Sequence, residues 1–185
     1  MAEEERIVEA KEQRIGEAVA YVLPGEGNRA LWVFGELVVY KTRSEQTGGA
    51  YSLFEIASPP GGGPPPHIQH REDESFYLLE GEYEFLVEDR SFGMDAGSLI
   101  YVPKGTLHAH KNVGEGTGRL LLSLTPGGLH ERFFEEIGEP ARETYRPQGP
   151  ADQQPMEKII AIATEYGIEI PPPDSSYGGQ EGNPD

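Results

Sequence analysis

The stretch "GGGPPPHIQHREDESFYLLEGE", residues 61–82, carries the pattern that decides the fold of this chain. In a β-strand, residues i and i+2 point to the same side, so His67 and Gln69 are predicted to share a face and His70 to point the other way. A bulge or turn within "REDE" then returns Glu74 to the face of His67. The stretch therefore predicts an imidazole, an amide and a carboxylate on one side, and it raises the question of what Gln69 does there.

A second stretch, "TLHAHKNV", shows the same alternation at residues 106–113. It places His108, His110 and Asn112 on one face of a strand. If both polar faces point into a closed sheet, four side chains meet around one point: His67, Gln69, Glu74 and His108. Imidazoles and a carboxylate with open positions suit a divalent first-row metal, so the sequence predicts one metal ion at this point.

The composition fits a small, turn-rich β-domain. A chain of 185 residues is long enough for one domain with a sizeable core. Its 24 glycines and 16 prolines indicate many turns and few long helices. The net charge of −17 repels phosphate backbones and anionic lipid surfaces, so no nucleic acid and no membrane is expected as a partner.

Three features predict a cytoplasmic protein. The sequence has no apolar run of the roughly 18 residues needed to cross a bilayer. Its N-terminal sequence, "MAEEERIVEAKEQR", is charged where a signal peptide is apolar. The absence of cysteine excludes disulfides, thiolate catalysis and cysteine-ligated zinc or iron–sulfur sites.

The pattern along the chain predicts four segments. Residues 1–18 are charged and predict an N-terminal arm. Residues 19–125 contain short runs typical of strands, separated by Gly, Pro and Asn, and predict an all-β barrel or sandwich. Residues 126–170 predict two short helices that pack against the outside of the barrel. Residues 171–185 predict a flexible tail, because they contain too few apolar side chains to offset the entropy of ordering.

Turn and capping residues predict where several elements begin and end. Gly81 in "EGEYEF" is predicted to turn a hairpin, and a second hairpin is predicted at "EDRSFG". Thr125 is predicted to cap the first helix, with Pro126 in its first turn and Gly138 at its end. The second helix is predicted to bury one face, which carries Met156, Ile159, Ile160, Ala163 and Tyr166.

Both stretches resemble the two sequence motifs of the cupin superfamily, whose members fold as a small jelly-roll β-barrel. Four fixed positions of the first motif, Gly-x5-His-x-His-x3–4-Glu-x6-Gly, are matched by Gly61, His67, Glu74 and Gly81. The chain departs from this motif at Gln69, where the family has a second histidine. All five fixed positions of the second motif are matched, by Gly97, Pro103, Gly105, His108 and Asn112. The resemblance implies a single jelly-roll (cupin) β-barrel with two short C-terminal α-helices.

The wording "GGGPPPH…REDESFYLLEGE" and the trailing segments "PGGLHERFFEEIGEPA" and "IIAIATEYGIE" are similar to bacterial quercetin 2,3-dioxygenase-like monocupins. This resemblance implies a dioxygenase that cleaves a flavonol-like or other enolisable aromatic substrate with dioxygen. His67, Glu74 and His108 match ligand positions, and Glu74 also matches the carboxylate that accepts the substrate hydroxyl proton. The implied cofactor is one divalent transition metal, which could be Fe, Mn, Ni, Co, Cu or Zn. Phe76 and His110 are predicted to contact the substrate.

Three roles stay open for Gln69. Its amide oxygen can ligate the metal as a weak, neutral donor. Alternatively, Gln69 lies outside the ligand set, which leaves a site of two histidines and one carboxylate. In the third alternative, a twist of the chain makes His70 the ligand in place of Gln69, but strand parity disfavours this. Residues 71–73 are predicted to be a solvated charge run, and His130 to be a surface or hydrogen-bonded core residue without a role in the site.

Two other functions stay open. A metal-dependent isomerase of a small sugar or acid would use the same ligands but needs basic residues to hold an anionic substrate. A non-catalytic small-molecule-binding cupin is expected if no metal is present. In every case the partner is a small molecule, and exposed edge strands together with the N-terminal arm predict a homodimer.

Overall fold

The computed structural model describes residues 29–141 and 154–172. The predicted arm at residues 1–18 and residues 173–185 of the predicted tail lie outside the described residues. In chain order, the elements are β1 (Ala30–Val33), β2 (Glu36–Thr42), the 3-10 turn η1 (Ser44–Gln46), β3 (Ser52–Ser58), β4 (His67–Gln69), β5 (Asp73–Glu80), β6 (Glu82–Val87), β7 (Arg90–Asp95), β8 (Leu99–Val102), β9 (Leu107–Asn112), β10 (Gly118–Thr125), α2 (Leu129–Ile137), β11 (Glu139–Pro140), α3 (Met156–Glu165) and β12 (Ile168–Glu169).

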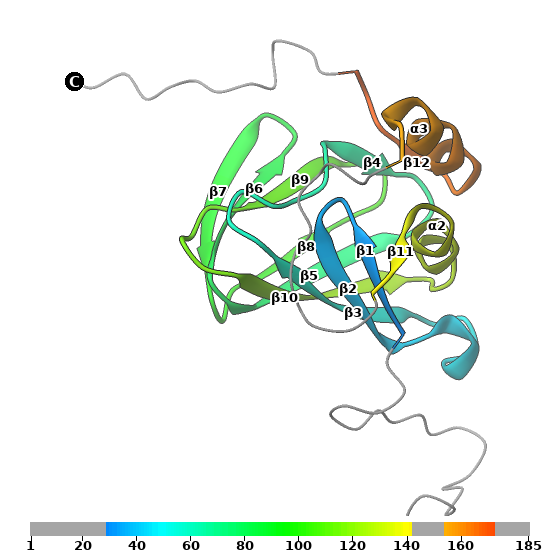
Figure 1. The fold of residues 1–185 in the computed structure, drawn as a ribbon, viewed down its shortest axis with the longest axis horizontal. Helices are drawn as coiled ribbons and strands as arrows, with labels where there is room; N and C mark the ends of the chain where they lie inside the picture. Colours follow the sequence, from blue (N-terminus) through cyan, green and yellow to red (C-terminus); the bar gives the residue numbers. More distant parts are fainter. Residues whose placement is uncertain (1–28, 142–153, 173–185) are drawn as a thin grey trace, which may run out of the picture.

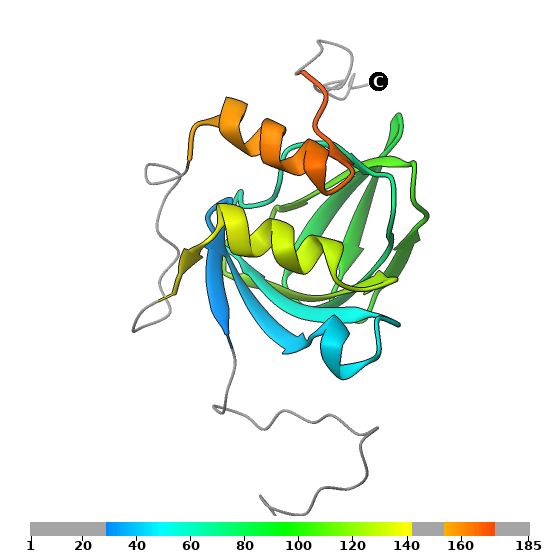
Figure 2. The same ribbon diagram turned by 90° about the vertical axis from the view of Figure 1, so that its right-hand side faces the viewer.

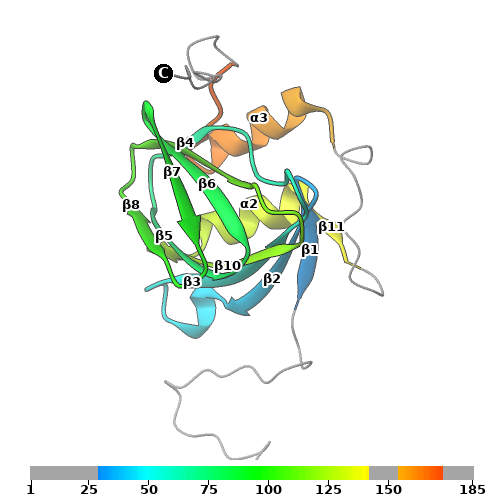
Figure 3. The same cartoon turned by 90° about the vertical axis from the view of Figure 1, so that its left-hand side faces the viewer.

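The strands form two antiparallel sheets that enclose a barrel (Figure 1). The seven-stranded sheet has the order β11-β1-β2-β3-β10-β5-β8, and the five-stranded sheet has the order β12-β4-β9-β6-β7. In Figure 3, β6 and β7 of the five-stranded sheet lie in front, and α2 lies behind them on the far side of the barrel. This arrangement confirms the all-β jelly roll with two C-terminal helices that the sequence predicts.

Alternating side chains on β5 and β10 build the core between the sheets. Leu120 and Leu122 of β10 lie opposite Leu78 and Phe76 of β5, and all four side chains are buried. Burial of each such side chain stabilises the fold by roughly 1.5–3 kcal/mol. The next inward position along β5 is Glu74, so the alternation that builds the core also points a carboxylate into it.

Gly81 connects the two sheets and does not turn a hairpin. The strand before it, β5, pairs with β10 and β8, whereas the strand after it, β6, pairs with β7 and β9. The hairpin predicted at Gly81 is therefore wrong, while the one predicted at "EDRSFG" is confirmed by the pairing of β6 with β7. Gly81 has a φ of 89°, and a Cβ atom there would lie 2.8 Å from the Cα atom of Gly118. The corner therefore requires glycine.

α2 and α3 lie next to each other across one open side of the barrel (Figure 2). The rings of Phe133 and Phe134 on α2 are buried, and the ring centroid of Phe134 lies 5.3 Å from that of Phe54 in β3. α2 thus packs against the barrel, and its buried face joins the core. Gly138 ends this helix as predicted.

The start of α2 differs from the prediction. Gly128, not Thr125, precedes the first helical residue, Leu129, and glycine has no side chain that can cap the helix. Instead, the carboxylate of Glu72 accepts hydrogen bonds from the backbone N–H groups of Leu129 at 3.0 Å and His130 at 3.2 Å. A negative charge is stabilised at a helix N-terminus, where the first N–H groups lack partners within the helix. Glu72 is fully buried, so the prediction that it is solvated is wrong.

The buried face of the second helix agrees in part with the predicted one. Ile159 and Ala163 are buried as predicted and Tyr166 is partly buried, whereas Met156 and Ile160 are exposed and Ile162 takes their place in the core. The helix packs against α2 and leads directly into β12. None of the helices in the described residues is long and apolar enough to cross a membrane.

β12 is a two-residue strand that extends the five-stranded sheet. The chain turns at Gly167, which has a φ of 78°, and Ile168 then pairs with Gln69 of β4. The C-terminal part of the described chain therefore lies alongside the strand that carries His67 and Gln69.

Candidate metal centre

Three strands bring His67, Glu74 and His108 together. The antiparallel register of β4 and β9 places His67 directly opposite His108. Glu74 comes from β5, which belongs to the other sheet. All three side chains are buried, and one potential ligand atom from each lies within 4.8 Å of the others. Closure of the barrel thus creates the cluster.

The potential ligand atoms of the cluster lie close together but do not form well-oriented hydrogen bonds with one another. Glu74 Oε2 lies 2.7 Å from His108 Nε2 and 4.0 Å from His67 Nε2. Nevertheless, Glu74 Oε2 and His108 Nε2 are buried without a well-oriented hydrogen-bond partner among the described residues. Buried polar atoms in this state call for an ion or a water. Two imidazole nitrogens and one carboxylate oxygen fit a divalent first-row metal with open positions.

The backbone holds both imidazoles in the orientation that a metal requires. The Nδ1–H group of His67 donates to the carbonyl oxygen of Pro65 at 3.1 Å, and that of His108 donates to the carbonyl oxygen of Thr106 at 3.0 Å. With the proton on Nδ1, the Nε2 atom of each neutral ring carries a free lone pair. These second hydrogen bonds therefore point the two Nε2 atoms into the cluster as ligands.

Burial and neighbouring charges set the protonation of the metal-free cluster. Burial and the nearby His108 lower the pKa of His67 to about 3. Burial raises the pKa of the Glu74 carboxyl, but His108 outweighs this effect, and the pKa falls to about 2. Burial lowers the pKa of His108, and the Glu74 carboxylate more than compensates, so the pKa is raised. Below the raised pKa of His108, a metal must displace the proton of that ring.

Gln69 lies on the inner face of β4, and its amide nitrogen faces Glu72 and His130. The side chain is buried, and His70 is exposed, as strand parity predicts. The Nε2 atom of Gln69 lies 3.0 Å from Glu72 Oε2 and 3.0 Å from His130 Nδ1. Its Oε1 atom accepts a long hydrogen bond of 3.4 Å from the backbone N–H of Arg71. This geometry favours the alternative in which Gln69 lies outside the ligand set.

His130 and Glu72 are two residues near the cluster to which the sequence assigned no role. His130 is buried and reaches the site from the first turn of α2. Neither residue belongs to a motif, and nothing in the local sequence indicates that α2 lies over the barrel. Only the packing of the helix brings them together.

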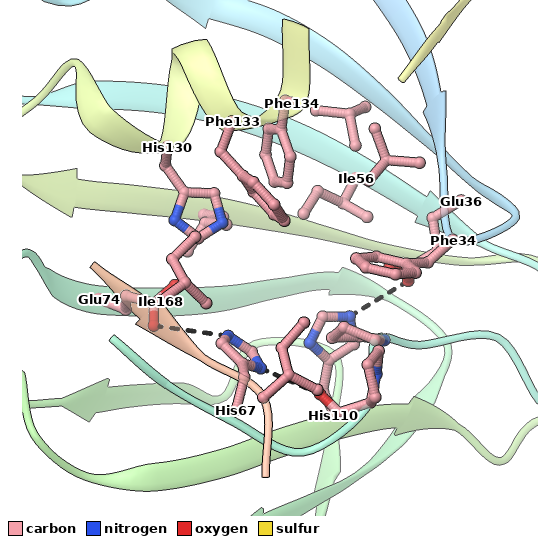
Figure 4. A pocket seen from close by; sticks show the side chains of 16 residues that line it. Phe34, Glu36, Ile56, His67, Glu74, His110, His130, Phe133, Phe134 and Ile168 are labelled. Atoms are coloured by element: carbon pink, nitrogen blue, oxygen red, sulfur yellow. Dashed lines mark hydrogen bonds and ion pairs between the residues drawn. The ribbon is translucent and has the colours of Figure 1, made fainter. Parts of the chain in front are cut away.

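A small cavity, lined by five polar side chains, opens beside the cluster (Figure 4). His67, Glu74 and His130 line one end, and His110 and Glu36 line the other. The cavity volume is about 40 Å³. The walls between the two ends are mainly apolar and include Val33, Val38, Ile56, Phe133, Phe134 and Ile168.

Of the two residues predicted to contact substrate, one lines the cavity and the other lies in the core. His110 lines the cavity, and its Nε2 atom lies 3.1 Å from Oε1 of the buried Glu36, which also accepts a hydrogen bond from Ser58. Phe76 is buried in the core, with ring centroids 5.9 Å from His108 and 5.7 Å from His110. Phe76 therefore packs against both histidine rings.

Sequence comparisons place the cluster within a known domain. The family model described as "Cupin domain" matches residues 54–124, which include both motifs. Quercetin 2,3-dioxygenase from Bacillus subtilis strain 168 is 30% identical over 124 residues, which cover 66% of this chain and 36% of that protein. The chain thus spans only about a third of the length of this relative, at 36%.

Structural comparisons agree on the fold. KdgF from Halomonas sp. superposes with a TM-score of 0.54 at 15% sequence identity, covering 60% of this chain and 96% of that one. An RmlC-like cupin from Shewanella frigidimarina NCIMB 400 superposes with a TM-score of 0.51 at 18% identity, again covering 60% of this chain and 96% of that one.

The cluster predicts that the purified protein binds about one equivalent of a divalent transition metal. The metal content is measured by inductively coupled plasma mass spectrometry after reconstitution with each candidate ion. His108→Ala should lose the metal, whereas the matched control His70→Ala, an exposed histidine outside the cluster, should retain it. Gln69→Ala should also retain it, and loss in that variant would place the amide among the ligands. A wild-type protein that takes up none of the six metals contradicts the site.

Metal affinity is predicted to fall as the pH decreases. The pKa of His108 is raised, so each pH unit below it should raise the apparent dissociation constant for zinc about tenfold, because one proton must leave. Competition with a chromophoric chelator, between about pH 8 and about pH 5.5, measures this dependence. An affinity that does not change over this range contradicts the involvement of His108.

Proposed function

Because the chain belongs to the cupin superfamily, we propose that it is a metal-dependent dioxygenase that cleaves a neutral, enolisable, flavonol-like substrate with dioxygen. The observation that carries this proposal is the cavity, in which two of the three potential metal ligands, His67 and Glu74, face walls that are mainly apolar. The quercetin 2,3-dioxygenase of Bacillus subtilis, to which the chain is similar, supports the choice of substrate class.

The charge of the cavity disfavours the isomerase alternative. Among the described residues, those that line the cavity include no lysine or arginine, whereas two carboxylates, Glu36 and Glu74, are present. A sugar phosphate or a small carboxylic acid would meet repulsion from these groups and find no cationic side chain to hold it. An apolar substrate with a hydroxyl group meets neither obstacle.

The residues of the site divide the chemistry between them. A divalent cation held by His67, Glu74 and His108 supplies Lewis acidity, which lowers the pKa of a hydroxyl group bound beside it. Glu74 is ionised at neutral pH, since its pKa is about 2, and it is the nearest carboxylate that can accept the hydroxyl proton. A carboxylate with so low a pKa is a weak base, so the transfer depends on the acidity of the substrate. The apolar walls exclude water from the enolate that results.

The size of the cavity limits what the described conformation can enclose. Its volume of about 40 Å³ is far below the roughly 300–1,000 Å³ of typical pockets for drug-sized ligands. It accommodates the reacting end of a substrate, and a complete flavonol requires the walls to move apart. One of the walls is β12, which is joined to β4 over only two residues. A smaller enolisable ring requires less movement.

The proposed activity predicts oxygen uptake by the metal-loaded protein. An oxygen electrode should record uptake with a flavonol or with a smaller hydroxypyranone, in a fixed ratio to the substrate that is lost. His108→Ala should be inactive because it loses a metal ligand. Ile168→Ala should increase the rate with the flavonol relative to the hydroxypyranone, because it removes a side chain from the cavity wall. No uptake by protein that demonstrably contains metal contradicts the dioxygenase and favours the non-catalytic binding protein.

The homodimer that the sequence predicts has a candidate surface at β8, which we include in the proposal. β8 lies at the end of the seven-stranded sheet, so one edge of its backbone faces no other strand of the described residues. Leu99 and Tyr101 of β8 are 63% and 56% exposed, and they lie beside Tyr77 of β5, which is 40% exposed. An uncharged edge strand of this kind favours pairing with a second copy.

The dimer is tested by light scattering coupled to size-exclusion chromatography. The molar mass measured for the wild type should be twice the chain mass of 20.3 kDa, whereas the double variant Leu99→Lys, Tyr101→Lys should have the mass of one chain. Phe92→Lys serves as the control, because Phe92 is an exposed aromatic residue on β7 in the other sheet. A monomeric wild type contradicts the prediction.

A further inference from the structure

A chain of buried polar side chains runs behind the metal cluster and ends at the cavity. It consists of Glu72, Gln69 and His130, all of which are buried. Glu72 is held by the backbone N–H groups of Leu129 and His130 at the start of α2. Neither the metal ligands nor the proposed proton transfer to Glu74 uses this chain.

The partners of Gln69 determine the orientation of its amide. The atom that lies 3.0 Å from Glu72 Oε2 must be the nitrogen, because a carboxylate only accepts hydrogen bonds. The other atom, Oε1, faces the backbone N–H of Arg71 and accepts from it. Both sides of the amide therefore support the same assignment.

The amide in turn determines which nitrogen of His130 carries the proton. Gln69 Nε2 lies 3.0 Å from His130 Nδ1. An amide nitrogen only donates, so His130 Nδ1 must accept, and the proton of the neutral ring is on Nε2. Glu72 Oε2 lies 3.7 Å from His130 Nδ1, which is too long for a hydrogen bond, so Glu72 acts on the ring through Gln69.

The protonated nitrogen of His130 is available to a ligand. His130 lines the cavity, and its ring extends from α2 toward Glu74 and Ile168 (Figure 4). Among the described residues, no hydrogen bond is formed by His130 Nε2. His130 does not belong to the cluster of His67, Glu74 and His108, so it can approach a substrate without being a metal ligand.

We infer that His130 donates a hydrogen bond from Nε2–H to an oxygen atom of the bound substrate, and that Gln69 is the positioning residue that keeps the proton on this nitrogen. The inference rests on the proposed function, since it takes the ligand to be a hydroxyketone at the metal cluster. A donor placed there stabilises the negative charge that develops on the oxygen of an enolate.

The inference also gives a reason for glutamine at position 69. The single amide group of Gln69 supplies both N–H groups, one to Glu72 and one to His130. An imidazole at this position could not donate from one atom to two acceptors, because each ring nitrogen carries at most one proton. The departure from the first cupin motif thus matches the presence of a histidine on α2.

The protonation of His130 can be measured without substrate. Two-dimensional ¹H–¹⁵N correlation spectra of the imidazole rings, recorded on zinc-loaded protein, distinguish a protonated ring nitrogen from an unprotonated one. The signals of His130 are assigned by their absence in His130→Leu. The wild type should carry the proton on Nε2, and Gln69→Met, which has similar volume but no donor, should show a mixture of the two tautomers. Both variants should keep their zinc.

Binding of a small hydroxyketone tests the contact with substrate. The probe is 3-hydroxy-2-methyl-4-pyranone, titrated calorimetrically into zinc-loaded protein. His130→Leu should weaken binding about tenfold or more, which is the effect of one lost hydrogen bond to a charged oxygen. His130→Gln should restore most of the affinity, because its amide nitrogen can occupy the place of Nε2. His70→Gln, the removal of an exposed histidine, is the matched control and should bind as the wild type does.

The two measurements separate failure of the inference from failure of the proposed function. A proton on Nδ1 of His130 in the wild type, or full affinity in His130→Leu, overturns the inference even if the probe binds. A zinc-loaded wild type that does not bind the probe overturns the proposed hydroxyketone substrate and, with it, the contact from His130. Loss of zinc in Gln69→Met overturns the positioning role and makes Gln69 a ligand.

Discussion

The buried carboxylate of Glu72 is the constraint on which the surroundings of the site depend. A carboxylate that is removed from water must receive hydrogen bonds, and this one receives them from the backbone of α2 and from the amide of Gln69. Glu72 lies between the strand of His67 and the strand of Glu74. The same group therefore fixes the helix, the amide and the ends of two ligand-bearing strands relative to one another.

The chemistry of the site depends on the closure of the barrel. His67 and His108 come from neighbouring strands of one sheet, while Glu74 crosses from the other. The three atoms meet only when the sheets are packed on the core that Phe76 and its neighbours form. Burial of these polar groups is unfavourable, and a cation bound between them would offset that cost. Binding of a metal at this cluster would therefore stabilise the folded barrel.

Period-two alternation in the sequence predicted the inward faces at His67 and His108 and the outward face at His70, because strand geometry is local. The role of Gly81 could not be predicted in this way, since a corner between sheets and a hairpin both favour a glycine with positive φ. The burial of Glu72 and the position of His130 beside the site were also missed. Their partners are far apart in sequence, and a charged residue next to other charged residues resembles a solvated run until the helix that covers it is known.

The wall of the cavity formed by β12 belongs to a segment that follows the barrel in sequence. α3 and β12 attach through a short apolar face and the pairing of Ile168 with Gln69. The three potential ligands come from β4, β5 and β9, so a substitution at Ile168 would change one wall of the cavity without changing any of these ligands. One wall of the cavity and the cluster are thus encoded in separate parts of the chain, and natural selection can vary the first while the second is preserved.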